Sequence, residues 1–134
     1  MSQLCPCHSE RPYTTCCQPI HKGKKLPSPT QLARARYAAY ALSKVRFIQS
    51  TERPDSPLLP REFIERRRSL KQFCQNTQFL GLQILDEATL GNGQATVTFR
   101  ATLLQNGQDA SFTERSLFEL RNGRWVYVSA IAEG

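Results

Sequence analysis

The sequence predicts an α+β fold in which helices come first and one curved antiparallel sheet follows. Apolar residues repeat at helical spacing between residues 28 and 78, and from Phe79 onward they alternate with polar residues. Three Asn-Gly pairs divide the alternating part at regular intervals. A group of helices followed by a group of strands is typical of the α+β class.

The first predicted helix has a well-marked start. Ser28 is suited to cap it, Pro29 to occupy its first position, and Gln31 to complete a capping box. Its apolar residues recur at helical spacing, at Leu32, Ala35, Ala39 and Leu42. We expect this helix to end between residues 47 and 50. Pro60 can open a second helix, whose predicted apolar side consists of Phe63, Ile64, Leu70, Phe73 and Cys74.

The Asn-Gly pairs indicate hairpins, because Asn and Gly tolerate the positive φ values of a type I′ turn. They are Asn92-Gly93, Asn106-Gly107 and Asn122-Gly123. Three such turns predict four antiparallel strands in meander order. In the first strand, Leu80, Leu82 and Ile84 alternate and are expected to share one face. One curved sheet wrapped on two helices is the NTF2-like cone.

Four of the five cysteines lie close to the N-terminus, at Cys5, Cys7, Cys16 and Cys17. Two neighbouring thiol pairs can supply four ligands to one tetrahedral ion, and sulfur-rich tetrahedral sites favour zinc. We therefore expect one structural Zn²⁺ at this motif. His21 is the residue that could replace one of the thiols, since it lies four positions after Cys17.

Disulfide and redox chemistry fit the cysteines less well. Cys16 and Cys17 are adjacent and Cys5 and Cys7 are one residue apart, so a disulfide within either pair would be strained, although bonds between the pairs are geometrically feasible. The total of five cysteines is odd, and no apolar signal-peptide core follows Met1. The Cys-x-x-Cys spacing of redox motifs is absent at the N-terminus. We expect a cytoplasmic protein whose thiols stay reduced.

The run Cys5-Pro6-Cys7, eight residues, Cys16-Cys17 resembles the SEC-C zinc motif found at the end of the SecA preprotein translocase. Ser9, Pro12 and Tyr13 fit its spacing, while His8 and Glu10 stand where that motif normally has glycines. Such motifs are associated with the binding of partners.

The resemblance extends to the YchJ-like family, which joins a SEC-C motif to an NTF2-like domain. It rests on His21-Lys22-Gly23, on residues 32–40 and on residues 114–118. Thr51-Glu52 occupies the region where that family normally carries a Trp-His pair. The resemblance implies the architecture rather than an activity.

Prolines and lysines between residues 18 and 29 indicate a linker. We therefore expect a SEC-C-like zinc-binding segment with its linker at residues 1–26 and an NTF2-like domain at residues 27–134. If the linker isolates the two units, loss of the metal should unfold residues 1–21 and leave the second unit folded.

The net charge of +7 is unevenly distributed, since residues 79–134 carry four basic and six acidic residues. A basic surface favours nucleic acid or acidic protein partners. Its candidate residues are Arg11, Lys22, Lys24, Lys25, Arg66 and Arg67. No apolar run approaches the length of a membrane span.

The predicted cone has few residues suited to acid–base catalysis, because no histidine follows His21. Glu114 is a weak catalytic candidate, on one face of the third strand with Phe112 and Phe118. A buried carboxylate generally needs a partner, so we expect Glu114 to pair with Arg36 or to bond with Tyr37 or Tyr40. The candidate cavity residues are Arg36, Tyr37, Tyr40, Glu114 and Trp125.

Two functions therefore stay open at this level. The first, which the sequence favours, is a non-enzymatic zinc-binding interaction module that docks on a protein, RNA or ribosome surface through its basic N-terminal region. The alternative is a small-molecule-binding protein or acid–base enzyme that uses the cavity around Glu114. An exposed face of the sheet could also support a homodimer.

Overall fold

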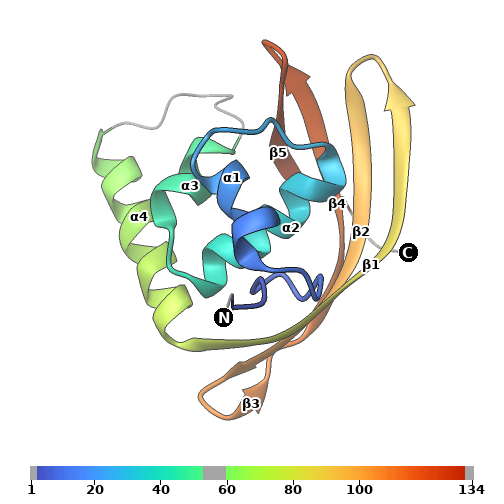
Figure 1. The fold of residues 1–134 in the computed structure, drawn as a ribbon. Helices are drawn as coiled ribbons and strands as arrows, with labels where there is room; N and C mark the ends of the chain where they lie inside the picture. Colours follow the sequence, from blue (N-terminus) through green and yellow to red (C-terminus); the bar gives the residue numbers. More distant parts are fainter. Residues whose placement is uncertain (1–2, 53–59, 132–134) are drawn as a thin grey trace.

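The structure is a computed structural model that describes residues 3–52 and 60–131. A curved antiparallel sheet forms one layer, and the helices cover its concave face (Figure 1). The helical elements are η1 (Tyr13–Thr15), α1 (Gln18–His21), α2 (Pro29–Ala41), α3 (Val45–Ser50) and α4 (Pro60–Gln75). The strands are β1 (Thr77–Gly91), β2 (Gln94–Gln105), β3 (Gln108–Asp109), β4 (Phe112–Arg121) and β5 (Arg124–Ile131). The predicted α+β order is confirmed.

Helix α2 begins as the sequence predicts. The Ser28 side chain accepts a hydrogen bond from the Gln31 N–H at 3.2 Å, and the Gln31 side chain accepts one from the Ser28 N–H at 3.0 Å. These two bonds satisfy donors that a helix start leaves unpaired.

The end of α2 differs from the expectation of one helix fading near residue 50. The chain turns at Ser43, whose φ of 58° is left-handed, and α3 starts at Val45. This break places Val45 and Ile48 in a buried cluster with Leu70 and Cys74 of α4. The gain in buried apolar surface favours two short helices over one long one.

Helix α4 starts at Pro60 as predicted, but only part of its predicted apolar side is buried. Leu70 and Cys74 are 4% and 7% exposed, and Phe73 packs beside the sheet. Phe63 and Ile64 are 41% and 54% exposed, so the first half of α4 extends beyond the core.

The three Asn-Gly pairs form the predicted hairpin turns. All six residues have positive φ values, between 51° and 80°. The sheet has the order β1-β2-β4-β5, with antiparallel pairs throughout, which is the predicted meander. The short β3, which was not predicted, pairs with the end of β2 before the chain enters β4.

The predicted alternation in β1 is interrupted at Leu80. A shift of register between Phe79 and Gly81 leaves Leu80 without a cross-strand partner, and its side chain is 52% exposed. Phe79 pairs with Leu103 and takes the place on the inner face. The bulge therefore corrects the expectation that Leu80 shares a face with Leu82.

Helix α2 lies at the centre of the core. Its Leu32 packs with Val97 and Phe118 of the sheet, and its Tyr37 packs with Ala101 and Leu103. Within the described residues, none of the helices combines the length and the apolar character that crossing a membrane requires.

The α2 cap gives a first prediction. Ser28→Ala should lower the free energy of unfolding by about 1 kcal/mol, because the Gln31 N–H loses its acceptor. Ser28→Thr keeps a hydroxyl and should retain most of that stability. Equilibrium denaturation of both variants measures the difference, and equal loss in the two would contradict a capping role.

Candidate metal centre and ligand cavity

Four cysteine side chains converge in the N-terminal segment. The Sγ atoms of Cys5, Cys7, Cys16 and Cys17 all lie within 4.8 Å of one another. Cys16 Sγ lies 3.6 Å from Cys7 Sγ and 4.0 Å from Cys17 Sγ. Sulfur atoms bound about 2.3 Å from one tetrahedral ion would be roughly 3.8 Å apart. The cluster could therefore hold a metal ion.

A tight loop brings the first cysteine pair into position. The Cys5 N–H donates to the Arg11 carbonyl at 2.8 Å, and the His8 N–H donates to the Cys5 carbonyl at 3.1 Å. His8 and Glu10 have φ values of 63° and 70°. These are the positions where SEC-C motifs normally have glycine, which adopts such angles without strain.

Polar groups surround the sulfurs. Ser9 Oγ is 3.2 Å from Cys16 Sγ, and Arg34 Nη1 is 3.1 Å from the Cys7 carbonyl oxygen and 3.8 Å from Cys7 Sγ. Hydrogen bonding with the Cys17 thiol, and then with Cys5, lowers the pKa of Cys7. Four thiolates around one divalent ion carry a net charge of −2, which the Arg34 guanidinium partly offsets.

His21 does not join the cluster and serves as a link to α2. Its Nε2 lies 2.8 Å from the Ala35 carbonyl oxygen, so this nitrogen donates. Its Nδ1 therefore accepts the hydrogen bond from the Tyr13 hydroxyl at 2.7 Å. Burial lowers the pKa of His21, which favours this neutral form. The expectation that His21 could replace a thiol is corrected, since both ring nitrogens are engaged elsewhere.

The cysteine segment packs directly onto the rest of the protein. Cys7 and Cys17, 0% and 1% exposed, share a buried cluster with Ala35 and Ala38 of α2. Leu82 of β1 packs against the same cluster. The region expected to be a linker contains α1, which adds a buried apolar residue to this interface. This contact argues against the expectation that the cone would be indifferent to loss of the metal.

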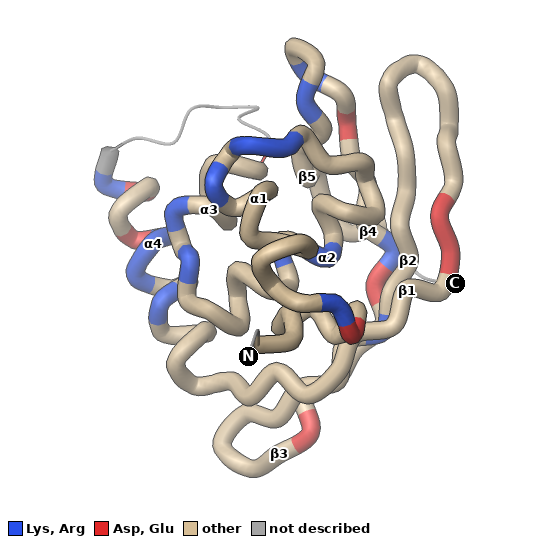
Figure 2. Tube along the Cα trace, viewed as in Figure 1, with Lys and Arg blue, Asp and Glu red and all other residues tan. Residues whose placement is uncertain are grey.

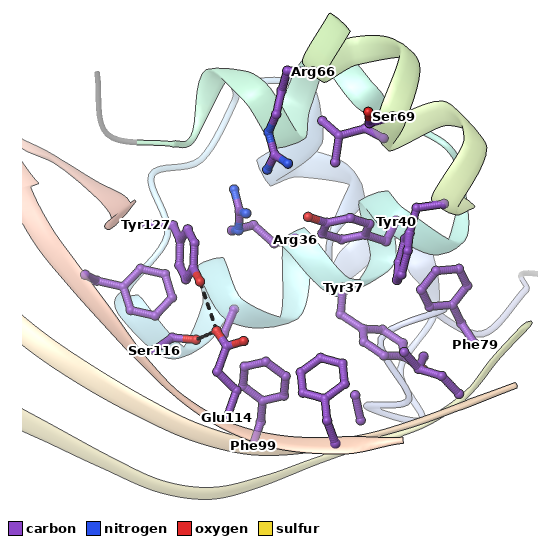
Figure 3. A pocket seen from close by; sticks show the side chains of 17 residues that line it. Arg36, Tyr37, Tyr40, Arg66, Ser69, Phe79, Phe99, Glu114, Ser116 and Tyr127 are labelled. Atoms are coloured by element: carbon purple, nitrogen blue, oxygen red, sulfur yellow. Dashed lines mark hydrogen bonds between the residues drawn. The ribbon is translucent and has the colours of Figure 1, made fainter. Parts of the chain in front are cut away.

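A cavity of about 460 Å³ lies between the helices and the concave face of the sheet (Figure 3). Four of the five predicted residues line it: Arg36, Tyr37 and Tyr40 from α2, and Glu114 from β4. Trp125 is not among the lining residues and packs instead against the cluster of Leu32, Val97 and Phe118. Much of the remaining wall is aromatic and includes Phe73, Phe79, Phe99 and Phe112.

Glu114 faces this cavity, but its partners differ from those expected. Its Oε2 accepts hydrogen bonds from the Ser116 hydroxyl at 2.6 Å and from the Tyr127 hydroxyl at 3.0 Å (Figure 3). Arg36 instead donates to backbone and side-chain oxygens outside β4. Burial, followed by the nearby Glu114 charge, raises the pKa of Tyr127, so Tyr127 remains a donor at neutral pH.

Arg36 is held almost completely inside the protein, at 7% exposure. Its Nη1 donates to the Ile48 carbonyl at 3.0 Å and to Thr51 Oγ1 at 2.7 Å, and its guanidinium carbon lies 4.5 Å from the centre of the Tyr127 ring. Its Nη2 lies 3.7 Å from Glu52 Oε1. A buried arginine with this many partners is fixed in place.

Arg66 reaches the same acceptor from α4. Its Nη2 forms a close ion pair with Glu52 Oε1, and this contact raises the pKa of Arg66. Sequence reasoning missed the shared role of Glu52, because it links residues that lie 16 and 14 positions away in the chain. The one available signal was the departure from the family's Trp-His pair at residues 51 and 52.

Lys and Arg positions lie on several separate segments of the chain trace, including the loop between α1 and α2 and the helix α4 (Figure 2). Lys22, Lys24 and Lys25 are exposed in the loop before α2. Arg11 donates to the Thr15 carbonyl at 2.9 Å. Arg66 is paired and lines the cavity, and the Arg67 guanidinium carbon lies 5.5 Å from the centre of the Phe63 ring. The ion pair with Glu52 reduces the net positive charge that Arg66 presents to a polyanion.

Comparison with protein families agrees with this architecture. The model of the YchJ middle NTF2-like domain matches residues 28–130, and the model of the SEC-C motif matches residues 1–19. The chain belongs to the YchJ family. The SEC-C motif and the four clustered thiols together fit a metal-binding module.

Relatives extend the match over nearly the whole chain. A UPF0225 protein of Deinococcus radiodurans is 35% identical over 94% of this chain and 87% of its own length. A UPF0225 protein of Haemophilus influenzae is 33% identical over 96% of this chain and 78% of its own.

Solved structures also resemble this fold, and two of them are compared with it. The solution structure of a SEC-C motif containing protein from Rhodopseudomonas palustris has a TM-score of 0.83 and 30% identity, and the match covers 98% of this chain and all of the other. A putative NTF2-like transpeptidase from Campylobacter jejuni has a TM-score of 0.55 at 13% identity, with 77% of this chain and 99% of the other covered. The second likeness concerns the fold alone.

The packing of the cluster on α2 gives a second prediction. Cys17→Ser should abolish stoichiometric metal binding and destabilise the whole domain by at least about 2 kcal/mol, because it disrupts the cluster against Ala35 and Ala38. Cys74→Ser alters a buried cysteine outside the cluster and should leave the metal content unchanged. Metal analysis and denaturation of both variants test this, and an unaltered unfolding transition of the cone in Cys17→Ser would contradict it.

Proposed function

We propose that this protein is a zinc-stabilised binding domain for a small molecule. A structural Zn²⁺ held by the four cysteines would fix the N-terminal segment against α2, and the cavity would bind the ligand. The observation that carries the proposal is the cavity of about 460 Å³, which has largely aromatic walls and a few polar groups directed into it. This combination is typical of ligand sites, which commonly measure about 300–1,000 Å³.

The donor set supports zinc in a structural role. Four thiolates complete a tetrahedral shell and leave no position for a reactive water. Three of the four cysteines are buried, which further limits access of water to the ion. Metal analysis of the purified protein should therefore give one zinc per chain.

Binding without turnover is supported by the cavity's titratable groups. No histidine occurs after His21, so none can reach the cavity from α2, α4 or the sheet. Burial raises the pKa of Tyr37 to about 12 and also raises that of Tyr40, so both keep their protons at neutral pH. Glu114 remains the sole weak candidate for a catalytic base among the described cavity residues. Its partners there are the hydroxyls of Ser116 and Tyr127, and the raised pKa of Tyr127 keeps that hydroxyl protonated at neutral pH.

Blocking the cavity mouth tests this proposal. Ser69 lines the cavity from an exposed position of α4, so Ser69→Trp can fill the mouth without disturbing the core. The neutral fluorescent probe N-phenyl-1-naphthylamine should bind the native protein and lose at least about tenfold in affinity for this variant. Gln72→Trp changes an exposed residue of the same helix outside the cavity lining and should bind the probe as the native protein does. Absence of probe binding to the native protein would refute the proposal.

Docking through a basic region is a second candidate function. Its support is the exposed run Lys22, Lys24 and Lys25, which directly follows α1 and precedes Leu26, itself 62% exposed. Such a run could contact RNA phosphates or an acidic protein surface. The paired state of Arg66 reduces the extent of the surface first predicted.

Salt dependence tests this second function. If the three lysines contact phosphates of single-stranded RNA, the association constant should fall roughly 20-fold between 50 and 200 mM salt. Replacing the three lysines by glutamine should remove this dependence. The matched triple variant Arg61→Gln, Arg68→Gln and Lys71→Gln on α4 should retain it. RNA binding that is indifferent to salt, or equal in the two triple variants, would contradict docking through this run.

A homodimer through the sheet also stays a prediction. Leu80, Leu85, Leu90 and Leu120 are exposed on the strands, each by 46% or more, and could contribute to such an interface.

A further inference from the structure

The charges around the cavity are separated into two ends. At one end, Arg36 and Arg66 share the single carboxylate of Glu52, which leaves one positive charge in excess. At the other end, Glu114 contributes one negative charge from strand β4 on the concave face of the sheet. In Figure 3, Arg66 approaches from α4 and Glu114 from the opposite side, with Arg36 between them. The cavity as a whole is therefore close to neutral but strongly dipolar.

The Glu114 end lacks a cationic partner. Both hydrogen bonds to its carboxylate come from neutral hydroxyls and converge on one oxygen, Oε2. Within residues 3–52 and 60–131, no lysine, arginine or histidine forms an ion pair with Glu114. A carboxylate in a partly apolar cavity is stabilised by a cation that brings charge and donors together. A ligand ammonium group supplies both.

The aromatic wall beside Glu114 also favours a cation. Phe99 and Phe112 line the cavity with ring centres 5.9 Å apart, and they come from the neighbouring strands β2 and β4. Aromatic faces attract ammonium groups through their quadrupoles. The same rings offer apolar surface to the carbon skeleton that carries the ammonium group.

The arginine end favours an acidic group. Arg36 is already bound to Ile48, Thr51 and Glu52, so it acts as a fixed charge. Arg66 is more exposed: its side chain is 42% exposed, its ion pair with Glu52 uses Nη2, and its other side-chain partner is the Tyr40 hydroxyl. A guanidinium carries five N–H donors and commonly binds carboxylates with two of them. Arg66 can therefore receive a ligand carboxylate at the edge of the cavity.

We propose that the cavity selects a small zwitterion with an aromatic body, of the amino acid or dipeptide class. Its ammonium group would bind Glu114, its carboxylate would bind Arg66, and its ring would pack among Tyr37, Phe79 and Phe99. The inference rests on the proposed small-molecule function and adds the chemical class of the ligand. Glu114 is then a binding residue, and Arg36 and Glu52 position the arginine end.

Calorimetric titration with a matched set of ligands tests this class. The probes are L-phenylalanine and glycyl-L-phenylalanine, which place the two charges at different separations, together with phenethylamine, 3-phenylpropionate and 3-phenyl-1-propanol. At least one zwitterion should bind about tenfold more tightly than either singly charged probe, because one charge-assisted contact is commonly worth that factor. The uncharged alcohol should bind most weakly.

Two substitutions test which residue binds the ammonium group of the ligand and which binds its carboxylate. Glu114→Gln should lower zwitterion affinity about tenfold while leaving 3-phenylpropionate bound at least as well as before. Arg66→Gln should have the reverse selectivity, with phenethylamine retained. Glu62→Gln, on an exposed turn of the same helix as Arg66, should change neither affinity. Circular dichroism establishes that each variant is folded, and Arg66→Gln keeps the test available if Glu114→Gln is unstable.

The outcomes separate this inference from the function on which it rests. Suppose that N-phenyl-1-naphthylamine binds. If the uncharged alcohol then binds as tightly as the zwitterions, or if no ligand of the set binds, the proposed ligand class is wrong and the small-molecule function of the cavity stands. If an amine or an acid alone binds as tightly as the zwitterions, the two-ended site is wrong. If neither the naphthylamine probe nor any ligand of the set binds, both proposals fail.

Discussion

The close approach of the cysteine segment to helix α2 is the constraint on which much of this structure depends. Ala35 and Ala38 are completely buried at that contact, and their small side chains let the sulfur cluster sit directly on the helix. His21 adds a polar link by donating to the Ala35 carbonyl. The opposite sides of α2 face the sheet and the cavity. A metal held by the thiols would therefore support the same helix that supplies Arg36, Tyr37 and Tyr40 to the cavity.

The cavity combines a rigid polar end with an apolar interior. Arg36 connects α2 to the end of α3 through Ile48 and Thr51, and the Thr51 carbonyl accepts a hydrogen bond from the Tyr127 N–H at 2.7 Å. This series of contacts ties the helices to β5 at the place where Tyr127 bonds to Glu114. The buried arginine thus helps to fix the hydroxyl that orients the carboxylate. Positioning of this kind is suited to a preformed binding site.

Sequence reasoning succeeded where a local rule decides the outcome. The capping box at Ser28, the start of α4 at Pro60 and the three Asn-Gly turns each depend on residues within four positions of one another. Strand alternation predicted that Glu114 shares one face with Phe112 and Phe118, and the family resemblance supplied the architecture as a whole. The cysteine cluster was predicted from spacing, because two neighbouring thiol pairs can supply four ligands to one tetrahedral ion.

The errors share a different cause, which is competition between distant contacts. Leu80 is exposed because a bulge in β1 places Phe79 on the inner face of the sheet. Trp125 does not line the cavity because it packs against the cluster that contains Leu32 of α2. Glu114 bonds to the hydroxyl of Tyr127, whose backbone partner on β4 is Phe118, whereas Arg36 contacts the end of α3 and Glu52. Local propensities contain no information about these choices.

By itself, the sequence determined the order of elements, the hairpin turns and the thiols able to bind a metal, since each depends on backbone preference or ligand chemistry over a short span. Only the tertiary structure decided that the metal segment lies on α2, that one carboxylate joins two arginines, and that Glu114 faces the cavity without a cation. These features depend on groups far apart in the chain, whose burial and charge are balanced only once the helices close over the sheet.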